Sequence, residues 1–273
     1  MMNVDKDKCI GCSLCVNDCM VRDIELVEGK AHIKNEACFK CGHCVAICPK
    51  EAVSTDEYNM EDVKDYNKEE FSIDADNLLN FIKFRRSVRS FKNKDVEVEK
   101  LLKIIEAGRF TQTATNSQNV SYIVVRDGIQ EIREMVLETL NNMGKSLLEN
   151  LNPQTMPFKK YAEMWVNMYE SYKENPDGED RLFFKAPALI LVVSDSQVNA
   201  SLAASNMELM TNALGLGTFF SGFLVRAAQG NKNIMDYLGL DESKQIVACM
   251  VIGYPNKKYL RTVPRKDAEI NWK

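Results

Sequence analysis

Eight of the nine cysteines of this 273-residue chain lie in two runs of identical spacing. Each run follows the pattern C-x2-C-x2-C-x3-C; the first contains Cys9, Cys12, Cys15 and Cys19, and the second contains Cys38, Cys41, Cys44 and Cys48. A cubane iron–sulfur cluster needs four thiolates, and this spacing lets three cysteines of a run bind one cluster while the fourth reaches a neighbouring cluster. The first 50 residues are therefore expected to carry electrons.

Disulfides and zinc are the alternatives for these cysteines. Eight cysteines allow 105 disulfide connectivities, but the charged N-terminus MMNVDKDK lacks the apolar core of a signal peptide, so an oxidising compartment is not expected. Zinc sites use C-x2-C pairs that are separated along the chain. Four cysteines within eleven residues fit a cluster better, and a zinc-bound interaction module remains the alternative from another class.

This stretch resembles the bacterial ferredoxins with two [4Fe–4S] clusters. The resemblance implies that one cluster is bound by Cys9, Cys12, Cys15 and Cys48, and the other by Cys38, Cys41, Cys44 and Cys19. One position departs from the pattern, because Pro49 follows the second run and Met20 follows the first; this change removes no ligand. Between the runs, Ile24 to Ile33 alternates apolar and polar residues around Glu28-Gly29, which predicts a short hairpin.

Length and charge predict a small domain, a linker and a medium-sized domain, over residues 1–53, 54–76 and 77–273. The middle stretch carries 2 basic and 9 acidic side chains and few aliphatic residues, as is typical of a linker. The basic excess downstream is too small to indicate nucleic-acid binding, and it suits an anionic cofactor. Apolar runs such as 186–193 are too short to span a membrane. We expect a soluble, cytoplasmic protein.

Hydrophobic periodicity predicts alternating helices and buried strands in the second domain. Helical patterns cover 78–84, 96–110, 129–151, 158–172 and 198–214, and strand patterns cover 121–125, 188–194 and 246–253. Helices that alternate with buried strands imply a layered α/β core. Cys249 lies in the last strand, where packing is its expected role. With a small N-terminal cluster domain ahead of this layered domain, we expect the α+β class for the whole chain.

Three polar segments interrupt this core, and each permits a plain structural interpretation. RRSVRSF, from Arg85 to Phe91, offers guanidinium donors for a phosphate, or is a cationic helix end. TQTATNSQN, at 111–119, offers amides for a heteroaromatic ring edge, or is an ordinary polar turn. GLGTFFSG, at 215–222, lets backbone approach a ligand, or is a helix C-cap with a tight turn at Gly215 and Gly217.

In their order and spacing, these segments and a later IGYP resemble the FMN-dependent nitroreductase family over residues 78–273. The resemblance implies a three-layer α/β/α domain that binds FMN, usually as a homodimer. The FMN contacts that it implies are Arg85, Arg86, Ser87 and Arg89 in the first segment, Thr113, Asn116 and Gln118 in the second, often from the other protomer, Ser221 and Gly222 in the third, and Arg261 or Arg265 near the C-terminus. The chain departs from the family loop at Gln112, Asn119 and Val120, where Pro, Pro and Trp are common.

The two resemblances together imply an FMN-dependent oxidoreductase in an anaerobe. An external low-potential donor, ferredoxin or similar, would reduce the two [4Fe–4S] clusters, then FMN, then a small organic acceptor such as a nitroaromatic, a quinone or an activated double bond. The alternatives are an electron-transfer flavoprotein that serves a protein partner, or an enzyme that acts on flavin or removes a substituent such as halide.

The sequence assigns no catalytic side chain. Its two histidines, His32 and His43, both lie in the N-terminal part. The segment 156–172 is rich in Met and aromatic residues, and it is expected either to cover the flavin or to form a helical core or dimer surface.

Overall fold

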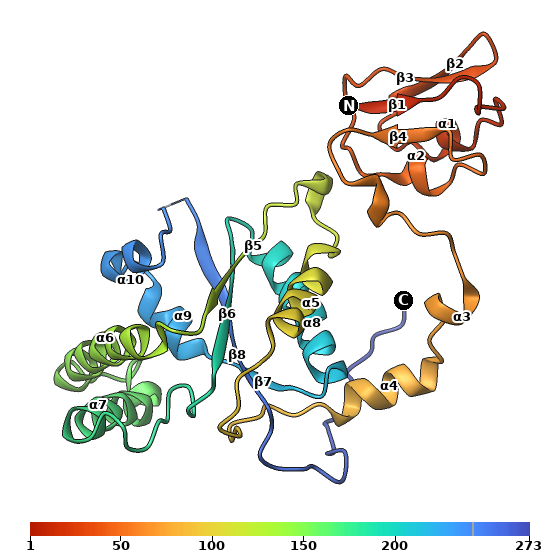
Figure 1. Ribbon diagram of the computed structural model, residues 1–273. Helices are drawn as coiled ribbons and strands as arrows, with labels where there is room; N and C mark the ends of the chain where they lie inside the picture. Colours follow the sequence, from red (N-terminus) through yellow and green to blue (C-terminus); the bar gives the residue numbers. More distant parts are fainter. Residues whose placement is uncertain (242) are drawn as a thin grey trace. The chain divides into compact units, whose positions relative to one another are not determined.

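The computed structural model describes residues 1–241 and 243–273, which separate into two compact units. The first unit contains Met1–Asp74 and Thr113–Gln118, and the second contains Ala75–Gln112 and Asn119–Lys273. Figure 1 labels the elements of both units. The first unit is therefore discontinuous in sequence, because the segment Thr113–Gln118 groups with the N-terminal residues.

The first unit contains two small antiparallel sheets. Strand β1 (Met2–Val4) pairs with β4 (Val53–Thr55), and β2 (Ile24–Val27) pairs with β3 (Lys30–Ile33). The β2–β3 turn has positive φ at Glu28 (53°) and Gly29 (74°), as a two-residue turn between twisted strands requires. The predicted hairpin is confirmed. Residues 54 and 55, which we expected in the linker, belong to β4 because they complete the pairing with β1.

Two short helices begin within the cysteine runs and pack against each other. Helix α1 (Leu14–Asp18) holds Cys15, and α2 (His43–Ala46) holds Cys44. The small core of this unit includes Met2, Ile24 and Ile33 together with buried cysteines. The acidic segment that follows forms only the single turns η1 (Met60–Asp62) and α3 (Lys68–Phe71), each capped by a preceding asparagine side chain, and neither buries a residue.

The second unit is built on a four-stranded sheet in the order β5–β6–β8–β7, in which every pair is antiparallel. The strands are β5 (Ser121–Val125), β6 (Ala188–Ser194), β7 (Gly217–Phe220) and β8 (Gln245–Gly253). All residues of β6 are buried, which explains its unbroken apolar run, because helices cover both faces of the sheet. Burying one such leucine or valine stabilises the fold by about 1.5–3 kcal/mol.

Alternate residues of the strands divide between two cores, as the period of a strand requires. Leu189, Leu191 and Val193 pack with one layer of helices: α6 (Ile129–Glu149), α7 (Lys159–Glu174), α9 (Gly222–Ala228) and α10 (Lys232–Tyr237). Ile190 and Val192 pack with the other layer, which consists of α5 (Val98–Arg109) and α8 (Gln197–Ala213). Figure 1 shows the two layers on opposite faces of the sheet. The three-layer α/β/α prediction is confirmed.

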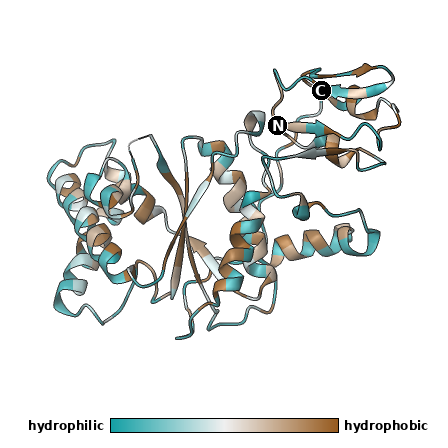
Figure 2. Cartoon of the chain, turned by 45° about the horizontal axis from the view of Figure 1, so that its top comes forward, coloured by the Kyte–Doolittle hydropathy of each residue, from teal (hydrophilic) through white to brown (hydrophobic). Residues whose placement is uncertain are grey.

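Helix α4 (Ala75–Phe84) opens the second unit and has no buried residue. Leu78, Leu79, Ile82 and Phe84 of this helix are exposed, and much of the helix is brown, the colour of hydrophobic residues, in Figure 2. Within the described ranges 1–241 and 243–273, helices long and apolar enough to traverse a bilayer are absent.

The helix predicted at 158–172 is confirmed as α7, which follows the 3₁₀ turn η3 (Met156–Phe158). Helix α7 packs on α6 and buries Trp165, Met168 and Tyr172, so the core interpretation of this segment is correct for these side chains. Gly215 has φ 72° after α8, as expected of a C-cap glycine. Gly217 does not form the tight turn, because it begins β7 and pairs with Gly253 of β8.

Candidate functional site

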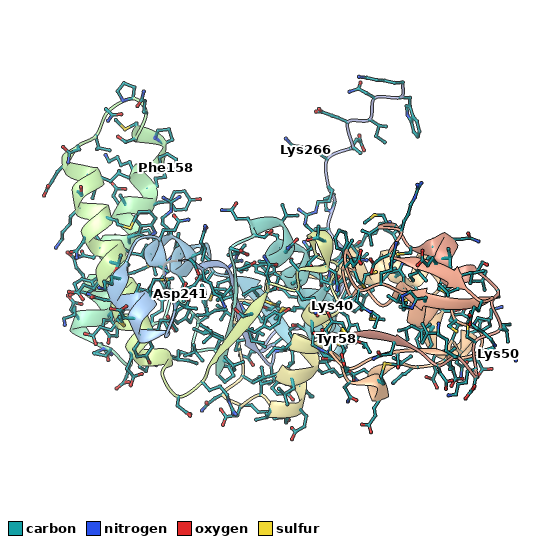
Figure 3. The ribbon with its side chains drawn as sticks, turned by 90° about the horizontal axis from the view of Figure 1, so that it is seen from above. Lys40, Lys50, Tyr58, Phe158, Asp241 and Lys266 are labelled. Atoms are coloured by element: carbon teal, nitrogen blue, oxygen red, sulfur yellow. The ribbon has the colours of Figure 1, made fainter. Side chains whose placement is uncertain are left out.

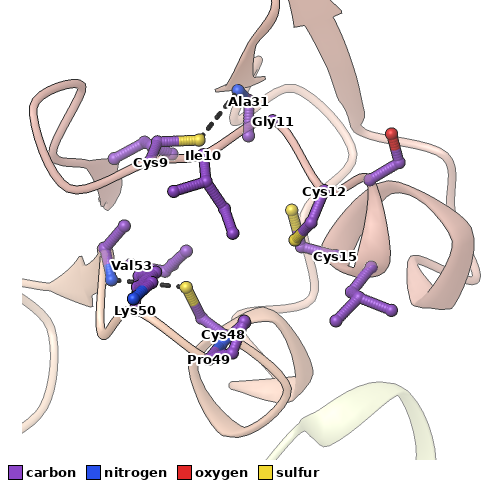
Figure 4. A pocket seen from close by; sticks show the side chains of 14 residues that line it. Cys9, Ile10, Gly11, Cys12, Cys15, Ala31, Cys48, Pro49, Lys50 and Val53 are labelled. Carbon is purple, nitrogen blue, oxygen red and sulfur yellow. Dashed lines mark hydrogen bonds between the residues drawn. The ribbon is translucent and has the colours of Figure 1, made fainter.

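Four cysteines from both runs surround one cavity of the first unit. Figure 4 shows Cys9, Cys12, Cys15 and Cys48 around this cavity, which is closed on other sides by residues such as Ala31 and Val53. This is the set that the ferredoxin resemblance implies for one cluster. Cys48 reaches it from the end of the second run, since α2 and the residues after it lead the chain back toward the first run.

Both runs use the same backbone geometry to turn their first three cysteines inward. The second residue after the first cysteine has positive φ in each run, at Gly11 (66°) and Lys40 (53°). The fourth residue after it also has positive φ, at Ser13 (64°) and Gly42 (75°), and these two residues are the N-caps of α1 and α2. Cys19 is the C-cap residue of α1, which packs on α2 and its Cys44. The fold therefore brings Cys48 to the first run, while a place for Cys19 in the second cluster stays a prediction.

Backbone N–H groups donate to three of the cluster-run sulfurs. Ala31 donates to Cys9 Sγ at 3.4 Å, and Ala52 donates to Cys48 Sγ at 3.3 Å. The N–H of Lys40 donates to Cys38 Sγ at 3.4 Å. Such bonds stabilise negative charge on sulfur and tune the potential of a cluster.

The surroundings of the sulfurs fit thiolates that are bound to iron. The N–H of Ala31 lowers the pKa of Cys9, whereas burial raises the pKa of Cys15 and raises that of Cys44 to about 11. A buried thiol with a raised pKa becomes a thiolate when a metal cation compensates its charge. In the part of the chain that the structure describes, no three His, Cys, Asp or Glu side chains are spaced to hold a single metal ion.

The second unit brings together three segments that are far apart in the sequence. The N–H of Val88 donates to Thr218 O at 3.0 Å, and a bridge joins Ser87 to Thr218. The N–H of Lys92 donates to Tyr254 O at 2.8 Å, and the N–H of Asn256 donates to Ser90 O at 2.9 Å. The RRSVRSF segment is thereby held between the GLGT and IGYP segments.

A basic cavity of about 420 Å³ lies where these segments meet. Its cationic lining residues are Arg85, Arg86, Lys92, Lys257 and Lys258, and its apolar ones include Phe81 and Phe84. Arg85 is half-buried and pairs with Glu208, while its buried Nε atom has no hydrogen-bond partner among the described residues. The excess of positive charge over this single carboxylate fits an anionic group such as a phosphate.

A second cavity of about 500 Å³ is lined by Glu208, the partner of Arg85. Phe220, Ser221 and Gly222 line it at the start of α9, with Glu208 and serines of α8. A Cβ atom added at Gly222 would meet nothing within 4 Å, so this backbone is open to a ligand. Ser221 uses its side chain to cap α9, at 3.5 Å from Leu224 N, and its N–H to donate to Cys249 O at 2.8 Å.

The remaining predicted flavin residues lie elsewhere. Ser87 and Arg89 are exposed and are not in the lining of the basic cavity; the Arg89 guanidinium lies 5.2 Å from the centroid of the Phe219 ring. Arg261 and Arg265 are exposed in the C-terminal segment, which Figure 3 shows near its label Lys266. FMN contacts of these residues stay a prediction.

Thr113, Asn116 and Gln118 group with the first unit. Asn116 donates through Nδ2 to the carbonyls of Phe39 and Lys40, at 3.1 and 3.0 Å. Gln118 donates to the hydroxyl of Tyr58 at 2.9 Å, and its N–H donates to Thr113 Oγ1 at 2.9 Å. These contacts do not test the predicted flavin role of the three residues.

Sequence reasoning missed several charged residues of the two cavities, among them Lys257, Lys258 and Glu208. Lys257 and Lys258 line the basic cavity, and Glu208 of α8 pairs with Arg85. The signal for the lysines was the NKK that directly follows IGYP. Nothing in the sequence distinguished Glu208 from other helical acids, because its partner lies 123 residues away.

Comparisons with known proteins divide the chain in the same way as its motifs do. Residues 82–254 match the model of the nitroreductase family, and residues 1–49 match that of a 4Fe-4S dicluster domain. The N-terminal part is 47% identical over 45 residues to one component of the ion-translocating oxidoreductase complex of Methanosarcina acetivorans. That match covers 16% of this chain and spans only 17% of the relative's length.

Two further matches concern the second unit. An Archaeoglobus fulgidus protein with the name NADH dehydrogenase/NAD(P)H nitroreductase is 24% identical over 184 residues, covering 65% of this chain and 84% of that protein. The solved Bacteroides fragilis nitroreductase with bound FMN is 21% identical, with a TM-score of 0.50 over 71% of this chain and 97% of that chain. The predicted fold class is confirmed. The predicted cofactors, FMN and [4Fe–4S] clusters, are confirmed at the level of family and fold.

Proposed function

The chain belongs to the nitroreductase family, and on that premise we propose that it is an FMN-dependent oxidoreductase fed by its own two [4Fe–4S] clusters. The observation that carries the proposal is the presence, in one chain, of a dicluster domain and a nitroreductase domain. A covalent tether gives the clusters a high effective concentration at the second domain, so electrons can pass between them without diffusion.

The proposed reaction is the two-electron reduction of a small organic acceptor. FMN, when bound, accepts electrons one at a time and passes two to a substrate. Two equivalents of a reduced ferredoxin or similar one-electron donor, with two protons, would convert a quinone to a hydroquinone. The same two electrons and two protons would convert a nitro group to a nitroso group and water. The donor is oxidised by one electron in each of its two equivalents.

The residues of the second unit supply binding and orientation. In the proposal Arg85 and Arg86, together with Lys257 and Lys258, bind the FMN phosphate, because charge-assisted bonds from forked donors match its oxygens. The open backbone at Gly222 lets the flavin ring approach the start of α9. Phe220 is 42% exposed and lines the same cavity, where an aromatic acceptor can stack against it.

We also propose further contacts to FMN. They would come from Ser87, Arg89, Thr113, Asn116, Gln118, Arg261 and Arg265. We also propose that the protein is a cytoplasmic homodimer, and sedimentation analysis of the purified protein tests the dimer directly.

An anaerobic absorbance titration of the purified holoprotein tests the direction of electron flow. NADH, NADPH and a reduced ferredoxin are added in separate experiments, and the bleaching of the clusters and of FMN is followed. We expect ferredoxin alone to reduce the protein, with the clusters bleaching no later than FMN. Rapid reduction of FMN by NAD(P)H, ahead of the clusters, would overturn the proposed direction.

A further inference from the structure

The two cysteine runs have the same backbone turn but different supports for it. In the first run the turn residue is Gly11, and a Cβ atom there would lie 2.0 Å from Gly29 O, so only glycine fits. In the second run the equivalent residue is Lys40, which has a side chain and a φ of 53°. A left-handed conformation is unfavourable for a residue with a Cβ, so the second turn requires contacts that hold it.

Asn116 supplies these contacts. Its Nδ2 group donates to both carbonyls of the strained turn, Phe39 O at 3.1 Å and Lys40 O at 3.0 Å. These two peptides lie between the cluster cysteines Cys38 and Cys41. The same turn directs the N–H of Lys40 to Cys38 Sγ, at 3.4 Å.

The segment that carries Asn116 is itself built for this position. Asn116 and Gln118 have φ of 54° and 46°, and Thr115 has φ of 52°, so three residues with side chains adopt left-handed backbone. Gln118 fixes the end of the segment by donating to Tyr58 Oη at 2.9 Å. Figure 3 labels Lys40 and Tyr58, two residues of the first unit that segment 113–118 contacts. Backbone strain of this kind persists only where surrounding contacts over-determine it.

We propose that Asn116 is a positioning residue for the cluster bound by Cys38, Cys41, Cys44 and Cys19, and that its amide sets the midpoint potential of this cluster. Segment 113–118 continues at both ends, through Gln112 and Asn119, into the chain of the nitroreductase unit. Asn116 thus supports the turn of the second run, whereas Gly11 of the first run needs no such support. The inference rests on the proposed function.

Cys38, Cys41, Cys44 and Cys19 would hold this cluster, which would gain and lose one electron at a time when bound. Loss of the Asn116 amide would loosen the turn and weaken the N–H bond to Cys38. Weaker donation to sulfur disfavours the reduced, more negative cluster, so its midpoint potential falls.

The test compares Asn116→Ala and Asn116→Asp with Thr115→Ala as the matched control, because the Thr115 hydroxyl donates to the adjacent Ala114 carbonyl, at 2.7 Å, and not to the cysteine run. An anaerobic redox titration of the holoprotein, followed by electron paramagnetic resonance, gives the midpoint of each cluster. We expect one midpoint to become more negative in Asn116→Ala, and further so in Asn116→Asp, where a carboxylate faces two carbonyls. Thr115→Ala should leave both midpoints unchanged, and a Cys41→Ser variant assigns the signal to the second run.

A second readout is the rate at which the flavin is reduced. Reduction of FMN after rapid mixing with reduced ferredoxin, at an FMN concentration that saturates each variant, should slow by about 10-fold or more in Asn116→Ala. Unchanged midpoints in both Asn116 variants, a shift confined to the first cluster, or an unchanged rate of FMN reduction would overturn the inference. If FMN in the wild-type protein stays oxidised while the clusters are reduced, the proposed function is overturned. The cluster midpoints are measured independently of FMN reduction, so they would still test the role of Asn116.

Discussion

The cluster unit and the nitroreductase unit assemble their cofactor sites in opposite ways. The cluster ligands lie within two short runs, Cys9–Cys19 and Cys38–Cys48. The basic cavity of the second unit instead combines Arg85 and Arg86 with Lys257 and Lys258, which lie at the two ends of the nitroreductase unit. A cluster site is therefore a local property of the chain, whereas the basic cavity exists only when the sheet has formed.

This difference has a consequence for mutation. A cluster ligand makes a coordinate bond that no neighbour replaces, so each substitution acts in an all-or-none way. The basic cavity shares one anion among several cations, so single substitutions there act by degrees. The following experiments examine this contrast in order of decreasing effect.

The largest effect is expected for Cys41→Ser with Cys44→Ser. The double variant removes two ligands of the second cluster, so we expect loss of that cluster and of donor-driven turnover, with FMN still bound. Iron content, the visible spectrum and turnover with reduced ferredoxin measure these outcomes. Unchanged turnover with FMN present would show that the clusters are not on the path. Cys249→Ala, in the other unit, is the control for loss of a cysteine as such.

A graded effect is expected in the basic cavity. Arg85→Ala removes a charged donor and leaves Glu208 unpaired, so we expect FMN to bind about 10- to 100-fold more weakly. Lys257→Ala with Lys258→Ala should weaken binding less, because both lysines are exposed. Fluorescence titration of the apoprotein with FMN measures both affinities. Lys160→Ala, at an exposed position of α7, is the matched control, and equal affinities in all variants would remove the cavity from the flavin site.

A smaller effect is expected where two of the assembled segments touch. A Cβ atom at Gly217 would lie 2.6 Å from Val88 Cγ2, so Gly217→Ala should destabilise the nitroreductase unit by about 1–3 kcal/mol. Val88→Ala makes room for that methyl group, so the double variant should lose less than the sum of the two single losses. Urea unfolding followed by circular dichroism measures the free energy of unfolding of both single variants and the double variant. Strictly additive losses would contradict the contact between Gly217 and Val88.

The smallest effect is expected at the ninth cysteine. Cys249 is fully buried in β8, and burial raises its thiol pKa. After the clusters are removed by a chelator and an oxidant, a thiol reagent at pH 8 should label the eight cluster cysteines, with Cys44 slow because its pKa is about 11. Cys249 should react only on denaturation. A ninth rapid label that disappears in Cys249→Ala would show that this strand opens.

Much of the fold was predictable because its signals are local. The period of 3.6 in helices such as α6 and the unbroken apolar runs of β6 and β8 follow from which faces are buried. The hairpin at Glu28-Gly29 followed from alternation around a turn pair. Gly217 was misassigned because a glycine before a turn and a glycine in a strand look alike until the partner, here Gly253, is known. The short helices α9 and α10 gave no periodic signal of useful length.

The sequence by itself determined the cluster unit, since the spacing of eight cysteines specifies their chemistry whatever surrounds them. It also specified the nitroreductase unit through the order of its segments. Only the tertiary structure decided which residues share a cavity, because Lys257, Lys258 and Glu208 meet Arg85 through the pairing of distant segments. It alone placed Asn116 on the turn between Cys38 and Cys41, since side-chain hydrogen bonds between residues 77 positions apart leave no pattern along a chain.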